Sequence, residues 1–169
     1  CNETYCHYLR RDNAISELTR VGSERVREYT TEYINDYIRQ AKEHGYIVAH
    51  NHPYWSMEME ERILSYEGLF SIEMCNYGSY VTNHIEHNGA IYDKLLSVGK
   101  RIACHGADDN HNKFPIDSPY SDSFGAFTMI YPEKFTYTGV INAMEKGQMY
   151  SSMGPVFKEI SVNGNKVHI

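Results

Sequence analysis

Strand-like and helical segments alternate along most of this 169-residue chain. Short apolar runs predict strands at residues 46–49, 69–74, 101–105, 125–131 and 149–152. Apolar residues three or four apart predict helices at about residues 24–44, 57–67, 91–98 and 137–146. This alternation is typical of βα units built on parallel strands, so the sequence predicts an α/β fold.

Local signals set the expected ends of these segments. Ser23 and Ser56 are predicted helix caps, and Gly45 and Gly68 are predicted helix stops. Glu58, Glu60 and Glu61 are expected on a solvated face of the second helix. The core-facing stripe of the first helix is predicted to be Val26, Tyr29, Tyr33, Tyr37 and Ala41.

The C-terminal residues do not continue the alternation of strands and helices. Asn163-Gly164 is predicted to supply the positive φ values of a tight turn in a hairpin over residues 160–169. We therefore divide the chain into an α/β domain, residues 1–155, and a C-terminal hairpin, residues 156–169. A lone hairpin is marginal in water, so it is expected to dock on another surface.

Two histidines follow the strand at residues 46–49. His50 and His52 are two residues apart, a spacing that lets neighbouring imidazoles converge on one ion. Pro53 is expected to hold His52 in an extended conformation. We predict that His52 is a metal ligand. His50 is either a supporting residue or a hydrogen-bonded histidine at a strand end, and Asn51 between them is assigned a supporting role.

The next strand carries a carboxylate and an amide. Phe70, Ile72 and Met74 share one side of this strand, so Glu73 points to the other. A carboxylate inside a closed barrel needs a metal, a base or a hydrogen-bond donor as partner. Asn76 lies just past the strand end, where site residues gather.

The strand at residues 101–105 leads into Asp108-Asp109-Asn-His111. In an extended segment, residues two apart project to the same side, so Asp109 and His111 are predicted to converge as metal ligands. The alternative is an ordinary capped loop. His105 and Asp108 are expected to tune the ligands or move a proton.

Composition narrows the classes of partner. The net charge is −6, with 16 basic against 22 acidic residues, which argues against a nucleic-acid partner. No segment has the ~20 consecutive apolar residues needed to span a membrane. The four cysteines lack a disulfide or Cys-x-x-Cys pattern, which favours a reducing, cytoplasmic location.

Four motifs together resemble the PHP (polymerase and histidinol phosphatase) family. They are Asn51-His-Pro-Tyr-Trp-Ser56, Ile72-Glu-Met-Cys-Asn76, Ala107-Asp-Asp-Asn-His-Asn112 and Met149-Tyr-Ser-Ser-Met-Gly-Pro155. The resemblance implies a distorted (β/α)7 barrel that binds divalent zinc, manganese or iron and hydrolyses a small phosphorylated substrate. It also implies His52, Asp109 and His111 as metal ligands, with His50, Asn51, Glu73, Asn76, His105 and Asp108 in supporting or substrate-binding positions.

One departure from the family pattern bears on function. The region before Tyr46 has no His-x-His, so half of the expected ligands are absent and we expect a partial domain. A non-catalytic PHP-like scaffold or interaction module is an alternative. A metal-dependent amidohydrolase is a further alternative.

Overall fold

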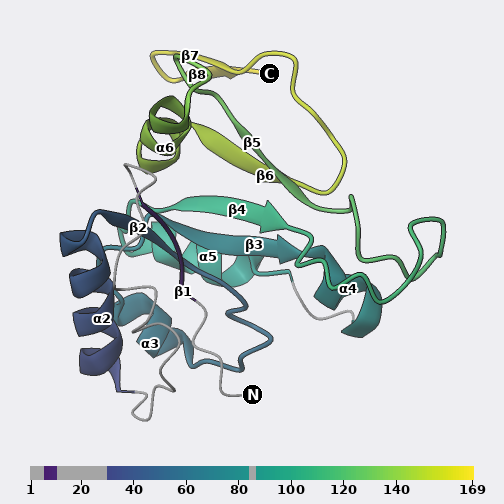
Figure 1. The fold of residues 1–169 in the computed structure, drawn as a ribbon. Helices are drawn as coiled ribbons and strands as arrows, with labels where there is room; N and C mark the ends of the chain where they lie inside the picture. Colours follow the sequence, from purple (N-terminus) through teal and green to yellow (C-terminus); the bar gives the residue numbers. More distant parts are fainter. Residues whose placement is uncertain (1–5, 11–29, 84–86) are drawn as a thin grey trace.

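The computed structural model describes residues 6–10, 30–83 and 87–169, and it has a mixed α/β fold (Figure 1). The larger sheet has the strand order β1-β2-β3-β4, with β2, β3 and β4 parallel and β1 antiparallel to β2. Its strands are β1 (Cys6–Arg10), β2 (Tyr46–His50), β3 (Ser71–Asn76) and β4 (Ala103–Ala107). Its helices are α2 (Thr31–Glu43), α3 (Glu60–Ser65), α4 (Tyr77–Asn83) and α5 (Gly89–Ser97). The sheet stays open in this part of the chain, so the α/β prediction is confirmed without a closed barrel.

Three helices cover one face of this sheet. Alternate residues of β2 and β3, including Val48 and Ile72, pack against α2, α3 and α5. The fully buried members of this core include Ile38 and Leu95, which come from helices far apart in sequence. The opposite face of β3 carries Glu73, as the alternation predicts.

The helix predicted at about residues 24–44 begins later than expected, at Thr31. Thr30 caps α2, its hydroxyl accepting the Tyr33 N–H at 3.1 Å, whereas Ser23 lies outside the described residues. Val26 and Tyr29 of the expected stripe also lie outside them. The stripe itself is wrong at Tyr33, which is exposed, because the more apolar set Ile34, Ile38 and Ala41 has the same spacing and faces the core.

The helix predicted from Ser56 is shorter than expected. α3 begins at Glu60, and the Ser56 hydroxyl donates to the His52 carbonyl at 2.6 Å instead of capping it. Glu58 therefore lies in the preceding loop, partly buried, and not on a solvated helix face. α4, directly after β3, was not predicted.

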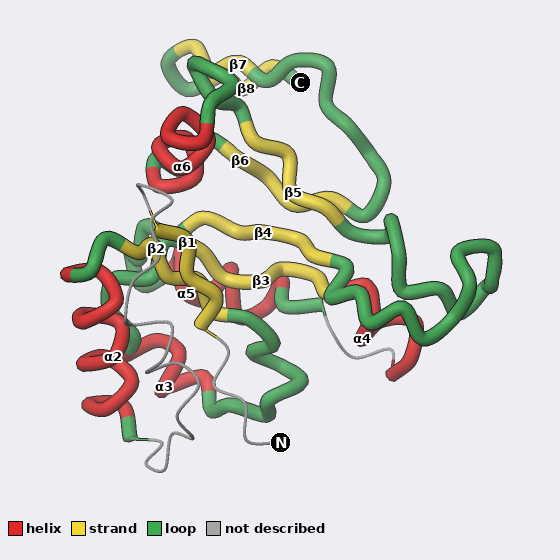
Figure 2. Tube along the Cα trace, viewed as in Figure 1, coloured by secondary structure: helices red, strands yellow, loops and turns green. Residues whose placement is uncertain are grey.

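A second pair of strands follows. β5 (Phe127–Ile130) and β6 (Met149–Ser152) are antiparallel, with α6 (Tyr137–Glu145) between them in the chain. The parallel βα rhythm predicted here is wrong, because Gln148 returns to pair with Tyr131 as soon as α6 ends. Figure 2 shows this pair beside β4, which it contacts without a backbone ladder.

Gly106 sets the distance between β4 and the β5–β6 pair. Its N–H donates to Thr128 Oγ1 at 3.0 Å, and the Thr128 hydroxyl donates back to the Gly106 carbonyl at 2.8 Å. A Cβ on Gly106 would lie 2.9 Å from Cys75 Sγ and 3.0 Å from the Phe127 carbonyl oxygen. The absence of a side chain thus permits this approach.

We expect Gly106→Ala to lower the free energy of unfolding by about 1–3 kcal/mol, since the added methyl group overpacks a tight contact. Urea unfolding followed by circular dichroism measures this. Gly89→Ala is the matched control: its Cβ would meet only the end of the His87 side chain at 3.3 Å, at the first position of α5. Equal stability of the two variants would contradict the prediction.

The predicted hairpin is present as β7 (Ser161–Asn163) and β8 (Lys166–His168). Its two-residue turn is Gly164–Asn165, and of these only Gly164 has a positive φ, at 61°. The expected turn at Asn163-Gly164 was therefore displaced by one residue. All residues of both strands are exposed, so the hairpin adds nothing to the buried core.

Candidate functional site

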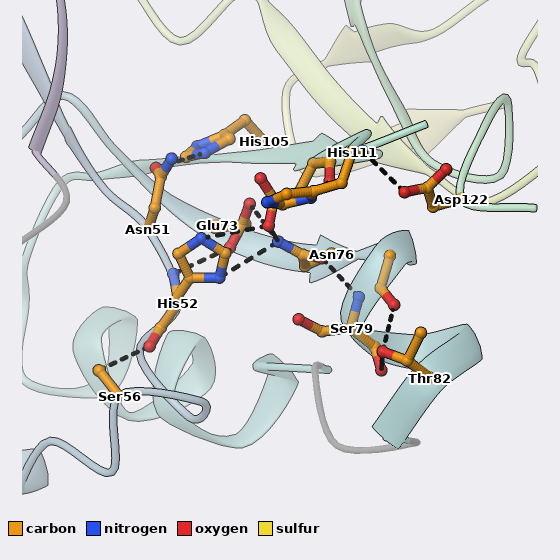
Figure 3. Close-up of polar contacts among 12 residues, drawn as sticks. Asn51, His52, Ser56, Glu73, Asn76, Ser79, Thr82, His105, His111 and Asp122 are labelled. Atoms are coloured by element: carbon orange, nitrogen blue, oxygen red, sulfur yellow. Dashed lines mark hydrogen bonds and ion pairs between the residues drawn. The ribbon is translucent and has the colours of Figure 1, made fainter. Parts of the chain in front are cut away.

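Residues that follow three neighbouring parallel strands meet at one edge of the sheet (Figure 3). His52 comes just after β2, Glu73 and Asn76 belong to β3, and Asp109 comes just after β4. His52, Glu73 and Asn76 are buried, and the Asp109 side chain is 31% exposed. The carboxyl ends of parallel strands lie at the same edge of a sheet, so the parallel order of β2, β3 and β4 brings these residues together.

The backbone of His52 is held in an unusual conformation. Its φ is 52°, so the extended conformation predicted from Pro53 is wrong. A left-handed conformation costs a non-glycine residue of order 1–3 kcal/mol. Two contacts hold it there: the His52 N–H donates to Glu73 Oε2 at 2.9 Å, and the His52 carbonyl accepts the Ser56 N–H at 2.9 Å.

The His52 ring lies between two carboxylates. Nε2 is 3.5 Å from Asp109 Oδ2, and Nδ1 is 3.6 Å from Glu73 Oε2. Both separations exceed the usual hydrogen-bond length. Two ligands of one tetrahedral ion, with bonds of about 2.1 Å, are about 3.4 Å apart. His52 Nε2 and Asp109 Oδ2 are therefore spaced as two ligands of a shared metal ion would be.

The side-chain nitrogen of Asn76 occupies the centre of this group. It lies 3.2 Å from His52 Nδ1 and 3.2 Å from Asp109 Oδ2. It also donates to Glu73 Oε1 at 3.3 Å. The Ser79 N–H donates to Asn76 Oδ1 at 2.9 Å, which fixes the amide orientation. Within the described part of the chain, no three His, Cys, Asp or Glu side chains converge closely enough to hold a metal ion.

His111 is not brought into this group. Asp109 has a φ of 50°, so the extended geometry predicted for Asp109-x-His111 is wrong. The His111 ring instead turns back on its own loop, with Nδ1 2.6 Å from the Asp109 carbonyl oxygen. The backbone N–H of His111 donates to Asp122 Oδ2 at 2.7 Å. His111 is exposed, as a loop residue would be.

Asp108 anchors a loop. Its carboxylate accepts the N–H groups of Gly125 and Ala126 at 2.9 and 2.8 Å, and also that of Phe124. The Gly78 N–H donates to the Asp108 carbonyl at 2.8 Å. Asp108 thus ties the chain after β4 to the start of β5 and to α4, and its carboxylate oxygens are engaged in backbone contacts.

His105 and Asn51 form a second polar group on the same face of the sheet. His105 Nδ1 is 2.9 Å from Ser71 Oγ, and its Nε2 is 3.1 Å from Asn51 Oδ1. Both ring nitrogens therefore have partners. This arrangement holds Asn51, next to His52, against β4.

His50 faces the helices, away from this edge. It packs edge-on against Tyr66 at 5.6 Å between ring centroids, and its Nε2 lies 3.3 Å from Glu58 Oε2. Burial, and after it the neighbouring His52, lowers the pKa of His50 to about 4, so its ring is neutral at neutral pH. His50 is thus a buried histidine at a strand end, but among the described residues its Nε2 lacks the hydrogen bond that the alternative expected.

Sequence reasoning missed Asp122, Ser79 and Glu58. Asp122 is 4% exposed, and its Oδ1 is buried without a hydrogen-bond partner. Its position in a polar loop carries no periodicity, so only the tertiary contact with His111 identifies it. Ser79 lies in the first turn of α4, where its N–H reaches Asn76. Because no helix was predicted there, this contact was not predicted either.

Known proteins give no independent guide to the chemistry of this site. Comparison with family models, curated proteins and solved structures finds no match to this chain. No helix in the described ranges is long and apolar enough to cross a membrane.

Proposed function

We propose that this chain contributes to a metal-dependent phosphoesterase, with His52 and Asp109 as metal ligands. The supporting observation is the 3.5 Å separation between His52 Nε2 and Asp109 Oδ2, with the Glu73 carboxylate on the other side of the same ring. Metal-bound histidines commonly have a carboxylate near the second ring nitrogen, which orients the ring. Zinc, manganese and iron all accept this nitrogen and oxygen donor set.

The residues around the ligands have distinct roles in this proposal. Glu73 holds the His52 backbone and orients its ring, and Asn76 holds Asp109. A divalent ion bound here would activate water for attack and offset charge on the phosphoryl oxygens of a small substrate. His111 would become a further ligand on turning its ring toward the ion, and the remaining ligands would come from other strands of a distorted PHP-type barrel.

The cellular setting proposed for this site is the cytoplasm. Cys75 and Cys104 are free cysteines, as expected in a reducing compartment. Burial raises the pKa of the Cys75 thiol to about 11, and the nearby Glu73 carboxylate adds to this effect. This thiol therefore stays protonated beside the site.

Metal stoichiometry tests the proposal. Protein purified without chelator or immobilised metal is expected to contain at least one zinc, manganese or iron ion per chain by elemental analysis. His52→Ala and Asp109→Ala should each lose the ion. Each substitution leaves only one of the two proposed ligands, which is too few for tight binding. Hydrolysis of a phosphate monoester should fall with the metal content.

His44→Ala is the matched control, because His44 is an exposed histidine at the end of α2. It should retain the metal and the activity. Metal content unaffected by both site substitutions, or absent from the wild-type protein, would contradict the proposal.

A second candidate is a non-catalytic scaffold. The observation that favours it is the Asn76 side-chain nitrogen, which lies 3.2–3.3 Å from side-chain atoms of His52, Glu73 and Asp109. It donates to Asp109 Oδ2, the oxygen that the first proposal assigns to the metal. A folded wild-type protein without bound metal would support the scaffold.

A further inference from the structure

A cavity of about 970 Å³ lies beside the turn that follows His52. Its apolar walls come from this turn, from α3 and from α5. They include Pro53, Tyr54, Trp55, Met57, Ile63 and Ile91. Its size and apolar character fall in the range of small-molecule sites.

The polar groups of this cavity do not suit an anion. Among the residues described, no Lys or Arg lines it, and the acidic Glu58 and Glu60 do. Glu58 accepts the Tyr66 hydroxyl, and Glu60 is paired with Lys94. A phosphate group bound here would meet His87 but no Lys or Arg among the described lining residues, whereas an uncharged aromatic group would bury apolar surface.

Trp55 connects this cavity to the candidate metal site. Its ring centroid is 5.8 Å from that of His52, with the ring planes at 53°. The Ser56 hydroxyl, which donates to the His52 carbonyl, holds the turn in place. A group bound against Trp55 would therefore lie next to a phosphoryl group held at His52.

We infer that this cavity binds the alcohol part of the substrate, and that the substrates are phosphate monoesters of uncharged aromatic alcohols. This inference rests on the proposed function. In the reaction, water forms a new P–O bond, the P–O bond to the aromatic oxygen breaks, and that oxygen leaves with a proton. The products are the aromatic alcohol and inorganic phosphate.

Trp55 is the only tryptophan of the chain, so its fluorescence reports on the cavity. Titration with 4-methylumbelliferone, an aromatic alcohol, in the presence of a chelator is expected to give saturable quenching. Ala90 lines the cavity from an exposed position on α5. Ala90→Phe should fill part of the cavity and weaken binding at least about tenfold, the effect of a lost apolar contact of this size.

Leu96→Phe is the matched control, since Leu96 is exposed on the same helix and does not line the cavity. It should bind 4-methylumbelliferone as the wild type does, and circular dichroism should show both variants folded. Quenching that does not saturate, or that is equal in Ala90→Phe and Leu96→Phe, would overturn the inference.

Hydrolysis separates this inference from the proposed function. With metal added, 4-methylumbelliferyl phosphate should be cleaved with a kcat/KM at least about tenfold above that of glycerol phosphate, and Ala90→Phe should reduce this preference. Saturable binding of the alcohol without hydrolysis of either ester would support the cavity and reject the phosphoesterase. Hydrolysis of both esters at equal kcat/KM would support the phosphoesterase and reject the cavity as the site for the alcohol.

Discussion

Glu73→Gln is expected to lower the free energy of unfolding by about 3 kcal/mol, the scale of a lost hydrogen bond to a buried charged group. Glu73 is 1% exposed, and its two oxygens accept the His52 N–H and the Asn76 side chain. A glutamine keeps only one acceptor oxygen. Its NH2 group would face either the His52 N–H, which would then be buried without an acceptor, or the Asn76 side chain, which would lose one of its acceptors.

Urea unfolding of metal-free protein measures this effect. Glu61→Gln is the control, because Glu61 is exposed in the first turn of α3. Its unfolding free energy should stay within about 0.5 kcal/mol of the wild type. An unchanged or higher value for Glu73→Gln would contradict the prediction, and would mean that the buried carboxylate costs stability in the absence of metal.

The second large effect is expected in the core. Leu95→Ala should lower the free energy of unfolding by about 2–5 kcal/mol, because it removes a buried side chain and leaves a cavity. Leu95 is 1% exposed and packs with Ile72 and Ile91 in the core beneath the sheet. The loss should appear as a lower urea midpoint with an unchanged slope.

Leu96 provides a control of identical chemistry. It follows Leu95 directly in α5 but is 46% exposed. Leu96→Ala should change stability by less than about 0.5 kcal/mol, since alanine also has the better helix propensity. Similar losses in the two variants would contradict the assignment of the buried face of α5.

Elements with strong local signals could be predicted from the sequence. The apolar run at residues 46–49 is a strand in the structure, and Ile91 and Leu95 are on the buried side of a helix. Alternation along β3 also predicted that Glu73 lies opposite the helix-covered face. These features follow from residue periodicity, which needs no knowledge of distant contacts.

The contacts between side chains at the site could not be predicted, because they depend on residues far apart in the sequence. His52 and Asp109 both have positive φ values, which local rules disfavour for these residues, so their direction depends on long-range contacts. The Glu73 carboxylate on the His52 N–H is one such contact. Likewise β5 and β6 run antiparallel because the chain reverses directly after α6. Periodicity carries no information about the direction in which a chain returns.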